Sequence, residues 1–155
     1  MGLFSFLKSK TADYFTETEK DAILKAIKQA EQRTSGEVRV FIENRCKYVD
    51  PLDRAAEIFF GLKMDATDDH NAVLVYLAMK DRQFAVFADK GIYTALGPDY
   101  WNREAGLMLQ AFRKESYADG LVKVISDVGE ALHRNFPYDH NGDKNELPDN
   151  IVFGK

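Results

Sequence analysis

The sequence has few of the residues that build disulfide frameworks, zinc sites or membrane spans. Its 155 residues include one cysteine and three histidines. The single cysteine, Cys46, excludes an internal disulfide, and the scarcity of both residue types argues against a zinc site. No uninterrupted apolar run approaches the roughly 20 residues that cross a bilayer. These absences exclude a disulfide-rich secreted domain and an integral membrane protein. We interpret Cys46 as a small side chain rather than a nucleophile.

An excess of basic residues is also absent. Lys and Arg number 21 against 25 Asp and Glu, so the net charge is −4. A nucleic-acid-binding protein would normally present a concentrated basic face, and none is predicted here. Hydrophobic residues make up 45% of the chain and charged residues 30%. These proportions are typical of a globular protein with one sizeable core.

The ends of the chain carry little information on location. The opening MGLFSFLKSK is too short for a secretory signal, so we expect a cytoplasmic protein. Its apolar residues from Leu3 to Leu7 could touch a membrane surface, although a frayed or docked terminus is the favoured interpretation. We therefore treat residues 1–15 as an N-terminal segment, flexible or surface-associated, and 16–155 as a single domain with a polar C-terminal tail.

Periodicity predicts an alternation of helices and strands. Thr16 and Glu19 form a capping box that starts a helix, and Asp50-Pro51 starts another. EVRVFIENR alternates as a strand, while AVLVYLAM and FAVFAD form a hairpin around the turn KDRQ. Two further helices follow DKGIYTALG, a predicted loop with one helical turn. The first of them is expected to pack through Trp101, Ala105, Met108, Leu109 and Phe112.

The order of these elements predicts an α/β protein. The first strand, the helix after it and the AVLVYLAM strand form a βαβ unit, so these strands should be parallel. The fold class is a three-layer α/β/α sandwich around a small mixed sheet of three or four strands. Ile151, Val152 and Phe153 could dock back on this body.

This topology brings acidic residues together at one edge of the sheet. The hairpin partner runs opposite to the central strand, so Asp89 should lie close to Asp69 and Asn71, with Asp68 beside them. Glu37 begins the parallel first strand at the same edge. Oxygen ligands of this kind are what Ca²⁺ or Mg²⁺ requires, and a cation would offset their repulsion. The alternative is a purely structural role, in which the acidic residues only form turns and caps.

Several residues near this edge have weaker predicted roles. Lys90 could hold a small anion beside the metal or be a solvated loop lysine. Gly91 permits a positive φ or a close approach of two chains. His70 is interpreted as a solvent-facing loop residue. A second acidic stretch, Asp139–Glu146, resembles half of an EF-hand loop, but its glycine is misplaced and a solvated turn is favoured.

Several segments resemble the TPM-domain family, in its short stand-alone bacterial form. They are TSGEVRVFIE, DRAAEIF, HNAVLVYLAMKDRQFAVFADKGI, YADGL and the ending FPYDHNGDKNELPDNIVFGK. The family includes proteins linked to photosystem II repair in thylakoids. The resemblance implies a three-layer α/β/α fold, and a cleft at the sheet edge associated with divalent cations. The family's Asp-Asn-Gly matches Asp69 and Asn71 only loosely, because His70 is inserted and Ala72 replaces the glycine.

The resemblance leaves three functions open. The favoured one is a non-catalytic module that binds Ca²⁺ or Mg²⁺ through Asp68, Asp69, Asn71, Asp89 and Glu37, and a partner or small anion through the cleft. The second is a metal-dependent acid phosphatase, a proposal made for a plant relative, although the sequence lacks a recognised phosphatase motif. The third is an assembly or repair factor that acts by protein contact near a membrane.

Overall fold

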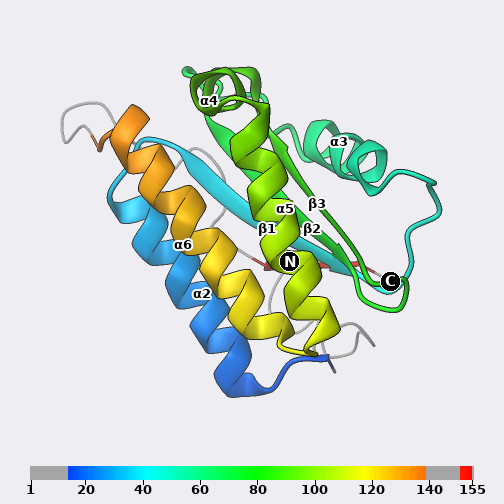
Figure 1. Ribbon diagram of the computed structural model, residues 1–155. Helices are drawn as coiled ribbons and strands as arrows, with labels where there is room; N and C mark the ends of the chain where they lie inside the picture. Colours follow the sequence, from blue (N-terminus) through cyan, green and yellow to red (C-terminus); the bar gives the residue numbers. More distant parts are fainter. Residues whose placement is uncertain (1–13, 139–150, 155) are drawn as a thin grey trace.

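The computed structural model describes residues 14–138 and 151–154 (Figure 1). The strands are β1 (Glu37–Glu43), β2 (Ala72–Ala78), β3 (Gln83–Ala88) and β4 (Ile151–Phe153). The helices are α2 (Glu17–Gln32), α3 (Pro51–Gly61), α4 (Lys90–Leu96), α5 (Pro98–Arg113) and α6 (Tyr117–Asn135). The segment Leu3–Leu7 and the EF-hand-like stretch Asp139–Glu146 lie outside the described residues.

The sheet has the order β3-β2-β1-β4. Strand β1 is parallel to both β2 and β4, whereas β3 is antiparallel to β2, as the hairpin and βαβ predictions require. The pairing of β4 with β1 confirms that residues 151–153 return to the body of the protein. Three parallel strands therefore end at one edge of the sheet, and the amino end of β2 meets the carboxyl end of β3 at the other.

Helices cover both faces of the sheet. Helices α2, α5 and α6 lie on one face and α3 on the other, while α4 lies at the edge where β3 ends (Figure 1). The apolar side chains of Val38, Val73 and Leu121 belong to the larger core beneath α2, α5 and α6. Leu74 and Phe59 belong to the smaller core beneath α3. The protein is an α/β/α sandwich, as the sequence predicted.

The predicted helix starts are present. Thr16 caps α2 in a reciprocal capping box with Glu19. Asp50 caps α3 by accepting a hydrogen bond from the Leu52 N–H, and Pro51 is its first residue. These side chains satisfy backbone donors that the helix itself leaves without partners.

Two details differ from the sequence prediction. DKGIYTALG contains a helix of two turns, α4, because Asp89 caps it. Leu109 was predicted to pack in the core but is 46% exposed. The buried stripe of α5 instead follows Trp101, Glu104 and Met108, and Leu109 is turned about 100° away from Met108 around the helix. A glutamate thus occupies a buried position.

Among residues 14–138 and 151–154, no helix combines the length and the apolar character needed to cross a membrane.

Candidate functional site

The loop before β2 and the loop after β3 lie against each other, as predicted. The Asp89 N–H donates to the Ala72 carbonyl oxygen at 2.9 Å, and the Gly91 N–H donates to that of His70 at 2.9 Å. We call this edge, formed by residues 67–72 and 89–91 with the start of β1, the acidic rim. Antiparallel pairing of β2 with β3 is its cause.

Gly91 allows the two loops to approach closely. A Cβ atom at this position would lie 2.3 Å from the Asp69 carbonyl oxygen and 2.6 Å from that of His70. Of the two roles proposed for this glycine, the structure supports the close approach. Any other residue would force the loops apart.

Asp89 is buried, and both of its carboxylate oxygens have partners. Oδ1 accepts a hydrogen bond from the Lys90 N–H at 2.8 Å, and Oδ2 lies 3.1 Å from His70 Nδ1. His70 adopts a left-handed backbone conformation with φ 49°. His70 is a loop residue whose side chain is 38% exposed, as the sequence interpretation expected, and its ring also contacts Asp89. Sequence reasoning lacked a signal for this contact, which depends on the unusual backbone of the loop.

The other predicted ligands differ in exposure. Asp68 and Asp69 are exposed, whereas Asn71 is 1% exposed. Asn71 Nδ2 donates to Ser35 Oγ at 3.1 Å, but its Oδ1 is buried and has no hydrogen-bond partner within residues 14–138 and 151–154. The hydroxyl oxygen of Thr67 is likewise buried without a hydrogen-bond partner among the described residues. Buried polar atoms without partners are uncommon, and each one is a position where a ligand could be accepted.

The remaining predicted residues lie at the same rim. The Glu37 N–H donates to the Asn71 carbonyl oxygen at 3.4 Å, and its side chain is buried. In the register of β1 with β2, Glu37 pairs with Ala72, whose side chain belongs to the core beneath α3. Lys90 is exposed beside Asp89.

The carboxylates of the rim are not gathered around one point. Within the part of the chain that the structure describes, no group of three or more His, Cys, Asp or Glu side chains is arranged to hold a metal ion. The structure therefore brings the predicted loops together without forming a closed carboxylate cage. The residues that could hold a cation are Asp89, the exposed Asp68 and Asp69, and Asn71 through Oδ1.

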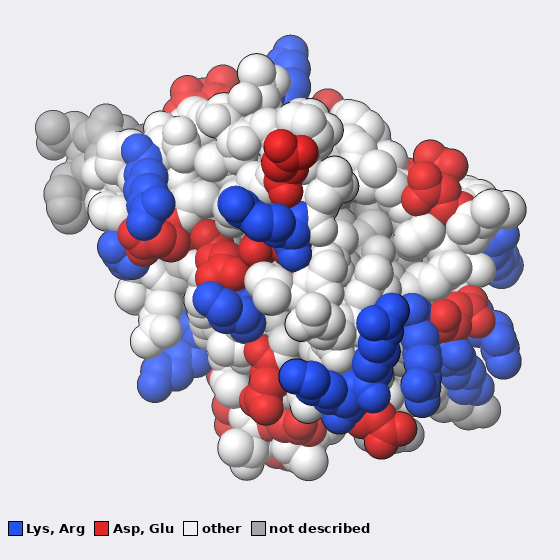
Figure 2. Space-filling model, in the orientation of Figure 1, with Lys and Arg blue, Asp and Glu red and all other residues white. Residues whose placement is uncertain are grey.

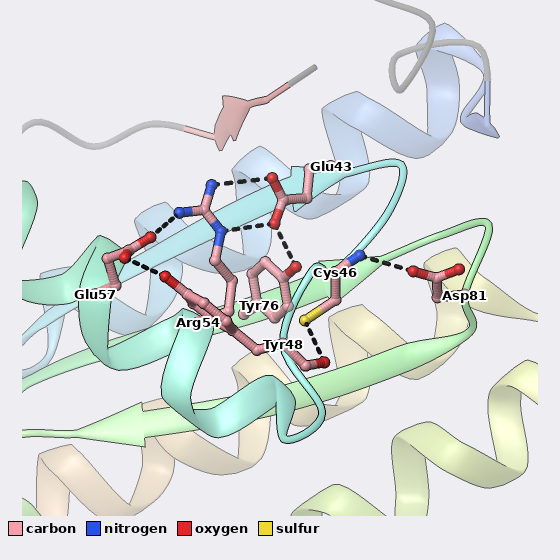
Figure 3. Close-up of polar contacts among 7 residues, drawn as sticks. All are labelled: Glu43, Cys46, Tyr48, Arg54, Glu57, Tyr76 and Asp81. Carbon is pink, nitrogen blue, oxygen red and sulfur yellow. Dashed lines mark hydrogen bonds and ion pairs between the residues drawn. The ribbon is translucent and has the colours of Figure 1, made fainter.

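A second polar region lies at the opposite edge of the sheet, where β1 and β2 end (Figure 3). Arg54, on α3, donates to both carboxylate oxygens of Glu43 at 2.9 and 3.0 Å. Glu43 also accepts a hydrogen bond from the Tyr76 hydroxyl, and Arg54 donates to Glu57. The Tyr48 hydroxyl completes the network by donating to Glu57.

This network holds a buried carboxylate in one orientation. Burial contributes most to raising the pKa of Tyr76 far above its usual range, and the hydrogen bond to Glu43 raises it further. The Tyr76 hydroxyl therefore stays protonated and donates a hydrogen bond to Glu43. The hydrogen bond to Glu43 likewise raises the pKa of Arg54. Sequence reasoning missed this region. Its only local signal is the i, i+3 spacing of Arg54 and Glu57, which is common on helices.

The network borders a cavity of about 810 Å³, which we call the basic cavity. Its lining includes the residues that follow β1 and β2, together with Arg54 and Gly154. Two acidic side chains line it, together with four cationic ones, Arg45, Lys47, Arg54 and Lys80. Figure 2 shows Lys and Arg side chains gathered at the lower right of the molecule, near the end of the β2–β3 hairpin in Figure 1.

The fold and these two regions define a class: an α/β/α protein with an acidic rim at one edge of a mixed sheet and a basic cavity at the other. The family model described as the TPM domain, with the name TPM_phosphatase, matches residues 9–131. The chain belongs to the TPM-domain family. A search of curated proteins found no match.

The solved structures that are similar to this chain include the following two. The BA42 protein from the psychrophilic bacterium Bizionia argentinensis is 38% identical, with a TM-score of 0.83, and the match covers 94% of this chain and 99% of that one. The N-terminal domain of the cg2496 protein from Corynebacterium glutamicum is 17% identical, with a TM-score of 0.57 over 76% of this chain and 74% of that one. The second similarity concerns the fold alone.

Proposed function

We propose that this TPM-domain protein is a non-catalytic module that binds a divalent cation, Ca²⁺ or Mg²⁺, at the acidic rim. The observation that carries the proposal is the contact between the two loops, in which the Asp89 and Gly91 N–H groups donate to Ala72 and His70. Through this contact, carboxylates from separate parts of the sequence share one edge. Hard cations take oxygen ligands of this kind.

Three features of the rim support the proposal. Asp89 is buried, so its carboxylate is a fixed anchor. Asn71 offers a buried amide oxygen that no other described residue hydrogen-bonds. Asp68 and Asp69 are exposed, so they can move toward an ion without losing packing. We infer that the cation binds to Asp89 and draws the exposed carboxylates inward, with Glu37 as a weaker contributor.

His70 is the group that a cation would have to displace. Its Nδ1 lies 3.1 Å from Asp89 Oδ2, which leaves that oxygen occupied. Cation binding would therefore be accompanied by movement of the imidazole ring away from Asp89. We expect this competition to weaken the affinity and to favour Ca²⁺, which tolerates irregular coordination better than Mg²⁺ does.

Calorimetric titration with Ca²⁺ and with Mg²⁺ tests the proposal. We expect saturable heat for the wild-type protein and at least a tenfold weaker affinity for Asp69→Ala. A matched control is Asp53→Ala, which removes an acidic residue from the first turn of α3. Absence of heat up to millimolar cation, or an equal effect of both substitutions, would end the proposal.

A small anion is a further expected ligand, and the basic cavity favours it. Lys47 and Lys80 line this cavity and have no ion pair among the described residues. Three parallel strands end at this edge, which is where ligands commonly bind in α/β sheets. This site is separate from Lys90, the anion-binding residue predicted from sequence.

Titration with inorganic phosphate and with citrate, monitored by NMR, separates the two anion sites. We expect the amide signals of residues 44–48 to shift, and Lys80→Gln to weaken binding several-fold. Lys90→Gln is the control for the rim. Shifts confined to residues 89–91, with no effect of Lys80→Gln, would assign the anion to the rim instead.

A metal-dependent phosphatase is the second candidate, favoured by the name of the matching family model. In this mechanism the cation at the rim would activate a water molecule, and Lys90 would neutralise phosphoryl oxygens. Phosphate release from p-nitrophenyl phosphate, with Asp69→Ala as the background, tests it. Release equal to that background would exclude the activity. The third function, an assembly or repair factor near a membrane, depends in its membrane part on residues 1–10, which lie outside the described residues.

A further inference from the structure

A groove lies between α5 and α6, on the face of the molecule that Figure 2 displays. Its volume is about 700 Å³, within the range of small-molecule sites. Leu96, Leu107 and Ala131 supply apolar parts of its lining, and Tyr100 and Glu104 supply polar parts. None of the residues that line the groove belongs to the acidic rim or to the basic cavity, and the groove has no role in the proposed function.

Two atoms of the groove, one on Glu104 and one on Tyr100, lack a hydrogen-bond partner among the described residues, although the Glu104 carboxyl group also hydrogen-bonds with Asp127. Glu104 is only 4% exposed, and its Oε1 is buried without a hydrogen-bond partner in the part of the chain that the structure describes. The hydroxyl oxygen of Tyr100 is also buried, and none of the described residues hydrogen-bonds it. Such groups cost free energy unless a ligand or another residue satisfies them. Both can accept a hydrogen bond, so a ligand that donates would satisfy both.

The other charged groups of the groove are already engaged. Lys123 Nζ lies 2.7 Å from the Asp127 carboxylate. Glu130 accepts from Arg33 at 2.9 Å and lies 3.5 Å from Arg134.

Arg103 is the remaining cation, and its guanidinium lies over the Tyr100 ring, 5.8 Å from the centroid. Glu104 forms no ion pair among the described residues, because the nearby cations Lys123 and Arg103 are placed against Asp127 and the Tyr100 ring. Its low exposure makes the ionised state of its carboxyl group costly in the free protein.

We propose that the groove binds a small organic cation that carries a primary ammonium group on a short alkyl chain. The ammonium group has three N–H donors and a positive charge, which Glu104 Oε1 and the Tyr100 hydroxyl oxygen can accept together. The alkyl chain contacts Leu96, Leu107 and Ala131.

The protonation state of Glu104 links this binding to pH. Burial contributes most to raising the pKa of Glu104 to about 8. The charge of the Asp127 carboxylate and its hydrogen bond with Glu104 raise the pKa further, whereas Lys123 and Arg103 oppose the rise. Near pH 7 the carboxyl group is mostly protonated, and the arriving ammonium group replaces its proton. Binding therefore releases one proton below pH 8, and affinity rises about tenfold per pH unit up to that value.

NMR titration with n-butylammonium at pH 6.5, 7.5 and 8.5 tests the proposal on the whole protein. Butan-1-ol is the neutral probe of equal length, and butanoate is the anionic one. We expect saturable shifts of α5 and α6 amides with n-butylammonium only, and tighter binding at higher pH. Equal binding of the alcohol, preferential binding of butanoate, or absence of binding would overturn the proposal.

Two variants locate the site. Glu104→Gln keeps the shape of the side chain in its neutral state. It should weaken the binding of n-butylammonium at pH 8.5 by at least tenfold. Leu107→Arg leaves Glu104 in place but obstructs and charges the groove, and it should weaken binding similarly. Asp119→Asn, an exposed carboxylate on α6, is the control. Unchanged affinity in both variants, or an equal loss in the control, would contradict the assignment.

Discussion

The N–H group of Gly91 lies 2.9 Å from the carbonyl oxygen of His70, and this hydrogen bond joins the loops on either side of the β2–β3 hairpin. The residues are far apart in sequence, but the antiparallel pairing of the strands brings them to the same edge of the sheet. Because the acidic side chains of the rim belong to these two loops, their proximity depends on this contact.

Gly91→Ala should therefore destabilise the protein. The new Cβ would lie 2.3 Å from the Asp69 carbonyl oxygen, so the backbone of one loop has to shift. We expect a loss of about 2–4 kcal/mol in the free energy of unfolding, measured by urea denaturation. Gly106→Ala is the control, because nothing lies within 4 Å of its added Cβ in the interior of α5. It should stabilise the protein by about 0.5–1 kcal/mol. Similar effects of the two substitutions would argue against a tight loop contact.

His70→Gly should increase the affinity of the rim for Ca²⁺. Glycine accepts the left-handed backbone of this position and releases Asp89 Oδ2 from its contact with the imidazole. We expect an increase of about three- to tenfold, or about 0.7–1.4 kcal/mol, in calorimetric titration. Arg82→Gly, at a left-handed position in the β2–β3 turn, controls for the backbone change. Weaker binding in His70→Gly would indicate that the imidazole supports the site rather than competes for it.

Arg54 should stabilise the protein mainly by neutralising Glu43. Arg54→Met leaves the Glu43 carboxylate, which is 7% exposed, with Tyr76 as its remaining side-chain donor among the described residues. The expected loss is about 3 kcal/mol in the free energy of unfolding. Adding Glu43→Gln removes the charge, so the double variant should lose less than the sum of the single variants. Arg45→Met, which breaks an exposed ion pair with Asp81, should cost less than about 1 kcal/mol.

Glu104 should make stability depend on pH in the direction opposite to most carboxylates. The folded protein raises its pKa from 4.5 to about 8 and so holds the proton more tightly than the unfolded chain. Its stabilising contribution is complete below about pH 4.5, is lost as pH rises to 8, and changes no further above that. We expect a difference of about 2–4 kcal/mol across this window between the wild type and Glu104→Gln, which has no such titration. Parallel stability curves for the two proteins from pH 5 to 8 would contradict this.

The sequence predicted the fold because its signals are local. The capping box of Thr16 and Glu19, the proline at α3 and the alternation in β1 each report the backbone state of a few neighbouring residues. Strand direction then follows from the lengths of the connections, and this was sufficient to place Asp89 beside the loop before β2.

The side-chain contacts could not be predicted in the same way. His70 reaches Asp89 from a left-handed backbone conformation, and the sequence does not predict this conformation for a histidine. Glu43 and Tyr76 meet through the register of β1 and β2 together with the position of α3. Glu104 is buried although the apolar pattern of α5 is satisfied without it. Each contact depends on the packing of elements against one another, which periodicity does not encode.

The most direct measurement of the central claim is an NMR titration of the isotopically labelled protein with Ca²⁺, in which every backbone amide is followed at once. If the two loops form one cation site, the amides of residues 67–72 and 89–92 shift together with a single dissociation constant, while those of residues 44–48 stay unchanged. Shifts in only one loop, two different constants, or no shift up to millimolar Ca²⁺ would contradict it.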